Sequence, residues 1–400
     1  MEIGRNKLNR RFTLYFVAYF IAHIVLFGFW PAILRGFGYN DTFIGIASSV
    51  STFSGMVLKL AISYWFDKKG HARALVIGTM TLFCVMQTLV FYLAGASWIV
   101  LLFSALCMST VGMVNSLGEV WLLKLSAAGS EPLDYGKLRS AGSMTYAVAG
   151  LFAGGILSRF GDVASCAITW TAWLMLVPLC FLIPQPPRTL SAEVESAAKK
   201  MTFAAQLKKL MQNRAFLILM LCGALDTVCE MTVTGNFSLI VQELGGTQAQ
   251  SGVGFFVMAF SEFWVVYFYS RLAERFTVKW LYAAGIFGTL LRAVVMSMAQ
   301  TPWQAVVIIA LNAVSFGLTA PGKVLLINDI VDYEFKAAAM QIYGIGTGIV
   351  RMLVLPLQGM VSDSFGILTM IRIFSVFSLL SFVIITAYFA AKQRREKTAA

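Results

Sequence analysis

The stretch NSLGEVWLLKLSAAGSEPLDYGKLRSAGSMTY, residues 115–146, contains two apolar runs separated by a polar turn. Glu119 lies near the end of the first run, and Arg139 lies near the start of the second. Burying a carboxylate or a guanidinium away from water is costly, so an apolar run normally excludes both. The pattern therefore indicates two consecutive helices in an apolar environment, each of which keeps a charge because something there needs it.

The composition extends this interpretation to the whole chain. Hydrophobic residues make up 58% of the 400 residues, charged residues make up 12%, and the mean hydropathy is +0.77. A bilayer core of about 30 Å needs roughly 20 apolar residues per helix. By that measure the chain divides into about twelve spans, near 12–34, 43–65, 74–94, 97–122, 138–158, 164–183, 215–240, 251–270, 280–299, 303–326, 338–361 and 366–391. We therefore predict an all-α integral membrane protein with no separate soluble catalytic domain.

The longest break between spans is PQPPRTLSAEVESAAKKMTFAAQLKKLMQNR, residues 184–214. Its prolines end the preceding helix, and its segment FAAQLKKLM is expected to form a short amphipathic helix on the membrane surface. We therefore predict an N-terminal six-helix half over 1–183, a cytoplasmic linker over 184–214, and a C-terminal six-helix half with a short basic tail over 215–400.

The basic residues predict the orientation. Only Arg35 and Arg159 fall in the outer loops of this scheme, which is the positive-inside pattern when both termini are cytoplasmic. The net charge of +12 then indicates topology and contact with anionic lipid, and not nucleic-acid binding. We expect a multi-pass protein of the inner (plasma) membrane.

Two corresponding turns suggest that the halves are related. FDKKGHAR (66–73) follows the second span and AERFTVK (273–279) follows the eighth, and in each an acid precedes several bases. WFDKKGHAR resembles the helix 2–3 signature of the major facilitator superfamily. PLDYGKLRSAGS (132–143) resembles the helix 4–5 junction of the group that contains lactose permease and phenylpropionate permease. FGFWPAILRGFGYNDTFIG, FSEFWVVYFYSRLAERF and GTLLRAVVMSMA fit the same group.

This resemblance implies a major facilitator fold, with twelve transmembrane helices in two halves around a central cavity. It also implies a solute:proton symporter that works by alternating access. The turn that contains Asp67, Lys68 and Arg73 is then expected to control the movement of the halves.

Glu119 and Arg139 are the first candidates for binding a solute. They lie on consecutive spans joined by a polar turn, and together they offer strong acceptors and a rigid donor fork to substrate hydroxyls. In lactose permease an acid and an arginine at these places contact sugar, although the spacing here is two residues longer. The resemblance also implies that Tyr146 stacks on the solute ring. Asn115, one turn before Glu119, extends the polar stripe.

Asp226 and Glu230 are four residues apart and share one helical face. Two carboxylates this close in a low dielectric cannot both ionise cheaply, so one is expected to hold a proton, or a cation is expected to lie between them. By resemblance, Glu262 and Arg292 match a carboxylate and an arginine that are important in lactose permease. Glu262 is then a candidate for substrate binding or proton coupling, and Arg292 for tuning a nearby acid.

One departure from the resemblance affects the coupling ion. The sugar-transporting relatives carry a His and a Glu on helix ten, where this chain offers Asn312 and Ser315. Asn312 is therefore a candidate substrate ligand, and proton coupling would depend on Asp226, Glu230, Glu262 or Glu119. Further candidate charges in the cavity are Lys59, Arg351 and His23, of which Lys59 and Arg351 are possible counter-ions of the acidic pair.

The candidate cavity contains equal numbers of acids and bases, which favours a neutral polyhydroxylated solute such as a sugar, oligosaccharide or glycoside. An aromatic or other organic acid is the alternative, and a non-transporting solute sensor is a further one. No catalytic set, phosphate-binding loop or metal-ligand spacing is visible, so we predict neither an enzyme nor a cofactor. The expected partners are a small-molecule solute, protons or another cation, and lipid, with the chain itself a monomer.

Overall fold

The computed structural model describes residues 5–69, 71–93, 96–128, 135–185, 203–332 and 335–399. Every regular element in these ranges is a helix. Ten of the helical segments are long and apolar enough to cross a membrane. Two shorter apolar helices, Ser97–Leu106 and Met144–Phe160, lie where the fourth and fifth spans are predicted. The predicted all-α membrane architecture is confirmed.

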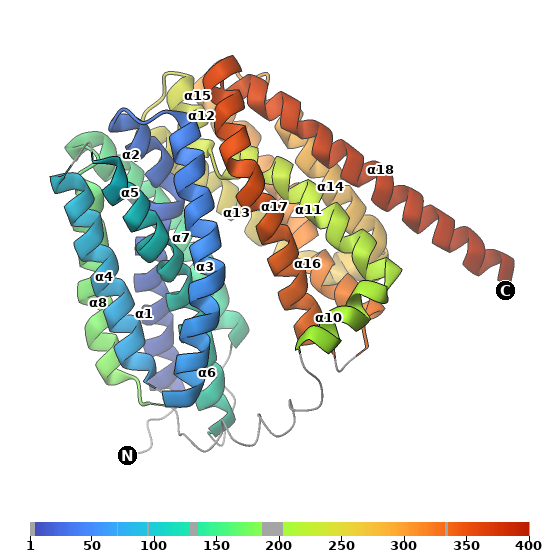
Figure 1. The fold of residues 1–400 in the computed structure, drawn as a ribbon, viewed down its shortest axis with the longest axis horizontal. Coiled ribbons are helices and arrows are strands. Elements are labelled where there is room, and N and C mark those ends of the chain that lie inside the picture. The colour runs from blue at the N-terminus through green and yellow to red at the C-terminus, as the bar shows by residue number, and fades with distance from the viewer. Residues whose placement is uncertain are drawn as a thin grey trace. The chain divides into compact units, whose positions relative to one another are not determined.

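The first of two compact units comprises residues 1–39, 46–200 and 247–256. Its helix α1 packs against α6, α7 and α8 (Figure 1). Phe12, Tyr15 and Trp121 are fully buried at these contacts and meet edge to face, with ring centroids 6.2 to 6.5 Å apart. Its helices are α1 (Arg5–Ile24), α2 (Trp30–Gly36), α3 (Asp41–Lys69), α4 (Ala72–Tyr92), α5 (Ser97–Phe103), α6 (Ser109–Ala128), α7 (Tyr135–Phe160) and α8 (Ala164–Leu182).

The second unit comprises residues 40–45, 201–246 and 257–400. Within it, α11 packs against α14, α17 and α18, and α14 also packs on α16 (Figure 1). Its helices are α10 (Phe203–Gln212), α11 (Arg214–Thr234), α12 (Phe237–Glu243), α13 (Gln248–Arg275), α14 (Val278–Met296), α15 (Pro302–Ile308), α16 (Asn312–Ile330), α17 (Lys336–Phe365) and α18 (Ile367–Ala399). The first turn of α3 is assigned to this unit, and the first residues of α13 are assigned to the first unit.

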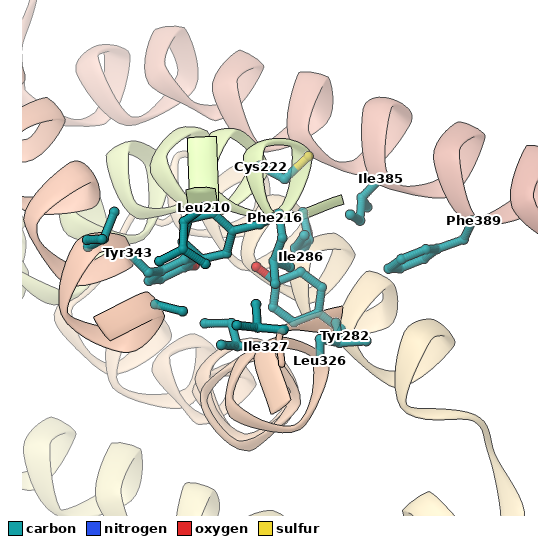
Figure 2. Close-up of a cluster of buried hydrophobic side chains, with 14 of the residues drawn as sticks. Leu210, Phe216, Cys222, Tyr282, Ile286, Leu326, Ile327, Tyr343, Ile385 and Phe389 are labelled. Atoms are coloured by element: carbon teal, nitrogen blue, oxygen red, sulfur yellow. The ribbon is translucent and has the colours of Figure 1, made fainter. Parts of the chain in front are cut away.

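A cluster of buried apolar side chains holds the second unit together (Figure 2). It includes Phe216 and Cys222 of α11, Ile286 of α14 and Tyr343 of α17. Lipid is as apolar as these side chains, so close packing, and not removal from water, makes such helices associate. Gly223 shows how close this packing is, because a Cβ atom there would overlap the Tyr343 hydroxyl. The remaining members of the cluster are Leu210, Leu219, Tyr282, Ala283, Leu326, Ile327, Val331, Phe335, Ala339, Ile342, Ile385 and Phe389.

The short helix predicted at FAAQLKKLM is confirmed as α10, which ends one residue before Asn213, and its place on the membrane surface stays a prediction. The Asn213 side chain then caps α11, because its Oδ1 accepts a hydrogen bond from the Phe216 backbone N–H at 3.2 Å. Its Nδ2 donates to the Ile330 carbonyl at the end of α16, at 2.9 Å. A single polar side chain thus begins α11 and attaches it to the end of α16.

Several predicted boundaries are wrong. The span predicted over 215–240 is two helices, because α11 ends at Thr234 and α12 begins at Phe237. Five-residue π-helical turns interrupt the first and fourth predicted spans, at Val25–Phe29 and Ser104–Met108. The last helix continues through the basic segment to Ala399, since that segment contains good helix formers and neither Gly nor Pro.

Candidate functional site

Asn312, at the start of α16, connects two charged side chains of the second unit. Its Nδ2 donates to Oε2 of Glu262 at 3.1 Å, and its Oδ1 accepts from Nη1 of Arg292. Ser315 Oγ also donates to the same Oδ1, at 3.4 Å. Three residues that the sequence marks as candidates therefore form one network, and both ends of the Asn312 amide are used inside the protein.

Arg292 is fully buried on α14 and extends this network toward α11. Its Nη2 lies 4.0 Å from Oε1 of Glu230, whose side chain is 15% exposed. The same Oε1 accepts a hydrogen bond from Thr234 Oγ1 at 2.7 Å. Within the described residues, Nε and Nη2 of Arg292 make no hydrogen bond. A buried guanidinium with unsatisfied N–H groups is costly, so these donors are well suited to an acceptor on a bound molecule.

Asp226 lies one turn before Glu230 on α11 and is buried. Its Oδ1 accepts a hydrogen bond from Ser378 Oγ at 2.9 Å, and the Thr289 side chain also hydrogen-bonds to it. In the part of the chain that the structure describes, Asp226 has these hydroxyl partners and no basic group within 4.0 Å. The two acids of the predicted pair therefore have different partners: hydroxyls for Asp226, and a guanidinium and a hydroxyl for Glu230.

Lys323 on α16 is a charge that the sequence analysis missed. It lies close enough to Glu230 and Asp226 to interact electrostatically with both, and its ammonium is 6.0 Å from the ring centroid of Tyr343. Arg351, which the sequence offers as a counter-ion, interacts in the same way with Glu230. The signal for Lys323 is present in the sequence, because a lysine within a predicted span is itself a candidate.

In the first unit, Asn115 and Glu119 lie one turn apart on α6, and Asn115 Nδ2 donates to Oε1 of Glu119 at 2.8 Å. Oδ1 of Asn115 is buried and has no hydrogen-bond partner among the described residues. Tyr15 of α1 lies close enough to Glu119 to interact with it electrostatically, while its own hydroxyl donates to the Val114 carbonyl at 2.7 Å. The stripe thus contains a carboxylate and an amide oxygen able to accept a hydrogen bond.

His23 and Tyr146 lie together in the first unit, with ring centroids 5.7 Å apart. His23 also stacks on Phe27 at 4.3 Å and 18°, and Phe20 meets Tyr146 edge to face at 6.4 Å. Tyr19 completes the group at 5.3 Å from His23. This aromatic group brings together two candidates that the sequence proposed separately, one for stacking on a solute and one for titration.

Other candidates lie outside the described side chains, namely Lys59, Asp67, Lys68 and Arg139. Their predicted roles, and the meeting of Glu119 with Arg139, stay predictions. Arg73 is described and is attached to the end of α8. Its Nε donates to the Cys180 carbonyl at 2.7 Å, its Nη2 donates to the Ile183 carbonyl at 3.2 Å, and its guanidinium covers the Phe181 ring.

Metal binding requires several ligands close together. Among the described residues, no three His, Cys, Asp or Glu side chains gather in a way that could hold a metal ion. The polar groups described inside the spans include carboxylates, guanidiniums, an ammonium, an imidazole, amides and hydroxyls, which suit hydrogen bonding and proton exchange.

In membrane proteins built from several spanning helices, ionisable side chains buried inside the spans mark solute or ion pathways. The model of the MFS_1 like family matches residues 10–349, and the chain belongs to this family. The family assigns the chain to the major facilitator class of membrane transport proteins and not to the enzymes.

Two curated relatives are similar to parts of the chain. The uncharacterised transporter YwbF of Bacillus subtilis (strain 168) is 22% identical over 272 residues, which are 66% of this chain and 64% of that protein. The major facilitator superfamily domain-containing protein 6-like protein A of Xenopus laevis is 31% identical over 78 residues, 20% of this chain and 13% of that protein. The chain therefore matches just under two thirds of the length of the first relative and a small part of the second.

Solved structures show the same fold at low sequence identity. The nucleoside transporter NupG superposes with a TM-score of 0.73 at 16% identity, over 96% of this chain and 99% of that one, and a mutant of NupG reaches 0.83. A bacterial homolog of the human lysosomal transporter Spinster, inward-facing and occupied, gives 0.73 at 14% identity, over 98% of both chains. The predicted major facilitator fold is confirmed.

Proposed function

We propose that the chain is a secondary active transporter that takes up a small polar solute by proton-coupled symport and alternating access. The observation that carries this proposal is the network of Glu262, Asn312, Arg292 and Glu230, with Asp226 beside it, inside the spans of a major facilitator protein. Ionisable groups are expensive in a bilayer, and a purely structural bundle can be packed with apolar side chains alone. Membrane transport proteins use such groups to bind solutes and to move protons.

A sugar, oligosaccharide or glycoside is the favoured solute. Glu119 and Asn115 offer acceptors to hydroxyl groups, and the unpartnered Oδ1 of Asn115 is a buried acceptor that a solute hydroxyl can satisfy. Arg139 would supply donors, and Tyr146 would stack on the solute ring. Glu262 and Asn312 of the second unit are further candidate ligands, and the resemblance to the lactose permease group points to the same class of solute.

An aromatic or other organic acid is the second candidate. The aromatic group formed by His23, Phe27, Tyr146, Phe20 and Tyr19 is a surface on which an aromatic ring can stack. Arg139 or Lys59 would then bind the carboxylate. A thermal-shift screen of the purified protein against sugars, glycosides and aromatic acids separates the two classes, because a bound solute stabilises the folded state.

We place the protein in the inner (plasma) membrane as a monomer, and the distribution of basic residues supports cytoplasmic termini. The predicted domain boundaries, 1–183, 184–214 and 215–400, belong to the same proposal. Asp67, Lys68 and Arg73 would form the turn at which the two halves part and rejoin.

The test is transport in proteoliposomes under an imposed pH gradient. The wild type should accumulate the solute found in the screen, whereas Asp226→Asn with Glu230→Gln should abolish accumulation and spare exchange of solute down its own gradient. Asp332→Asn is a matched control, because that carboxylate is exposed in an ion pair with Lys209. Glu119→Gln should abolish both activities.

Each other outcome has a definite meaning. Accumulation that survives the double substitution overturns coupling at Asp226 and Glu230 and leaves Glu262 or Glu119 as the candidate proton carrier. Accumulation that follows a sodium gradient makes Asp226 and Glu230 a candidate cation site and overturns the proposal that the proton is the coupling ion. Binding without accumulation or exchange in the wild type overturns transport and favours a sensor.

A further inference from the structure

Ser378 of α18 lies between two acceptors in the interior of the second unit. Its side chain is fully buried, and its Oγ is 2.9 Å from Oδ1 of Asp226 and 3.0 Å from the carbonyl oxygen of Ile286 on α14. A hydroxyl has one proton and two lone pairs, so Ser378 can donate to only one of these acceptors at a time. Its position therefore offers two alternative hydrogen-bond arrangements.

The two arrangements correspond to the two protonation states of Asp226. When the carboxylate is ionised, Ser378 donates to Oδ1. When the carboxyl is protonated, its O–H can donate to Ser378 Oγ, and the Ser378 proton can turn to the Ile286 carbonyl. A carbonyl oxygen has two lone pairs, so Ile286 can accept this bond beside the bond of its own helix.

We propose that Ser378 is a positioning residue that keeps Asp226 hydrogen-bonded in both protonation states. This inference rests on the proposed function, in which Asp226 takes up and releases a proton. Without such a partner, one of the two states would leave a buried polar group unsatisfied, which costs more than a typical hydrogen bond gains. With it, a proton can be loaded or released through the rotation of one hydroxyl.

Thr289 of α14 is a second hydroxyl partner of Asp226 with a similar arrangement. Its side chain hydrogen-bonds to the carboxyl, and its Oγ1 also lies 3.3 Å from the Gly285 carbonyl. Both hydroxyls therefore lie between Asp226 and a backbone carbonyl of α14. Because either can partly replace the other, a decisive test needs the two substitutions singly and together.

The charges that face Asp226 come from three helices. Glu230 lies on its own helix α11, Arg292 lies on α14, and Lys323 lies on α16. Among the described residues, the other titratable groups near it are Cys222 and Cys229 of α11, Tyr282 of α14 and Tyr343 of α17. The substitution at Ser378 removes none of these groups, so a change in the Ser378 variant that the Ser381 control does not show is attributed to the lost hydrogen bond.

The chain provides a matched control one turn away. Ser381 is also fully buried on α18, and its Oγ donates to the Cys222 carbonyl at 2.8 Å. Ser381→Ala removes the same atoms from the same helix and leaves Asp226 with its partners. Ser378→Thr keeps a hydroxyl at the position and serves as the conservative variant.

The experiment is infrared difference spectroscopy of the purified full-length protein during a pH titration in lipid. The band of the protonated Asp226 carboxyl is identified by its loss in Asp226→Asn. We expect this band to shift in Ser378→Ala, to shift further in Ser378→Ala with Thr289→Val, and to stay in place in Ser381→Ala and Ser378→Thr.

The pH profile of solute accumulation gives a second readout. In Ser378→Ala the midpoint should move to higher pH by about one unit, because the bond to the ionised carboxylate is the stronger of the two that are lost. The Ser378→Thr variant should restore the wild-type midpoint. A structural defect alone would lower the amount of active protein without moving the midpoint.

The inference and the proposed function can fail separately. A carboxyl band that Asp226→Asn removes but that stays unshifted in Ser378→Ala and in the double variant would overturn the role of Ser378 alone. A wild type that titrates without any Asp226 band would overturn the proposed coupling at this residue, and the role of Ser378 with it.

Discussion

The contact between Arg292 and Glu230 makes a quantitative prediction. Arg292 is fully buried, and the Glu230 side chain is 15% exposed, so removal of either partner leaves a poorly solvated charge behind. Breaking a buried pair in this way costs about 3 to 5 kcal/mol of unfolding free energy. We expect Arg292→Met and Glu230→Gln each to lower the unfolding free energy by an amount near the lower end of this range. In Arg292→Met, Thr234 continues to bind Glu230, and in Glu230→Gln, Asn312 continues to bind Arg292.

The double variant should lose less than the sum of the two single variants. With both charges removed, no uncompensated ion is left, and Met fills much of the volume of the arginine side chain. A coupling free energy of about 1 to 3 kcal/mol is expected for residues in contact. Arg292 also has N–H groups without acceptors among the described residues, which makes its replacement in the double variant less costly still.

Denaturant unfolding of the four proteins in detergent measures this coupling. A thiol-reactive dye can follow the transition, because Cys222 and Cys229 are fully buried and become reactive only on unfolding. The exposed pair of Lys209 and Asp332, 3.7 Å apart, provides the control cycle and should show a coupling of less than about 1 kcal/mol. Additive losses at Arg292 and Glu230 would refute the reasoning.

Two further predictions concern packing and pH. Gly223→Ala should destabilise the protein by about 1 to 3 kcal/mol, because the added Cβ overlaps the hydroxyl of Tyr343. Gly344 has open space around it, so Gly344→Ala should be neutral or slightly stabilising. Thermal unfolding of both variants checks this difference. Burial raises the pKa of the Asp162 carboxyl, which lies between α7 and α8 outside the spans. The ionised form therefore opposes folding, and stability present in acid falls as pH rises from the ordinary pKa through the raised one. Asp162→Asn should flatten that part of a stability–pH curve, and an unchanged curve would contradict it.

The spans could be predicted from the sequence because a membrane requires long apolar helices, and composition alone detects them. The breaks inside apolar runs could not be detected in this way. Gly235 and Asn236 end α11 and begin α12 inside the stretch 215–240, whose length fits a single span. The π-helical turn Ser104–Met108 consists of small and apolar residues that fit a regular helix equally well. Local chemistry gives a hint of the first break and none of the second.

The site was predictable only where its partners are close in sequence. The one-turn spacing of Asn115 and Glu119 placed both on one polar stripe, where the structure shows a hydrogen bond between them, and the same spacing placed Asp226 and Glu230 on one face. The long-range partners could not be predicted, because the sequence does not say which helices are neighbours. Ser378 lies 152 residues from Asp226, and a serine within an apolar span does not by itself predict a functional partner.

The distribution of satisfied and unsatisfied groups suggests how binding and coupling are connected under the proposed function. Asn115 has a buried oxygen without a partner among the described residues and can receive a solute directly, whereas both ends of the Asn312 amide are already bound. Arg292 holds Asn312 and also faces Glu230, so the contact with the acidic pair is one of the two interactions that fix the guanidinium. A guanidinium that gives up its contact with Glu230 can turn toward a solute and free Asn312 to do the same. Solute binding at Asn312 and proton uptake by the pair of Asp226 and Glu230 would then favour each other by the same factor, as linkage requires.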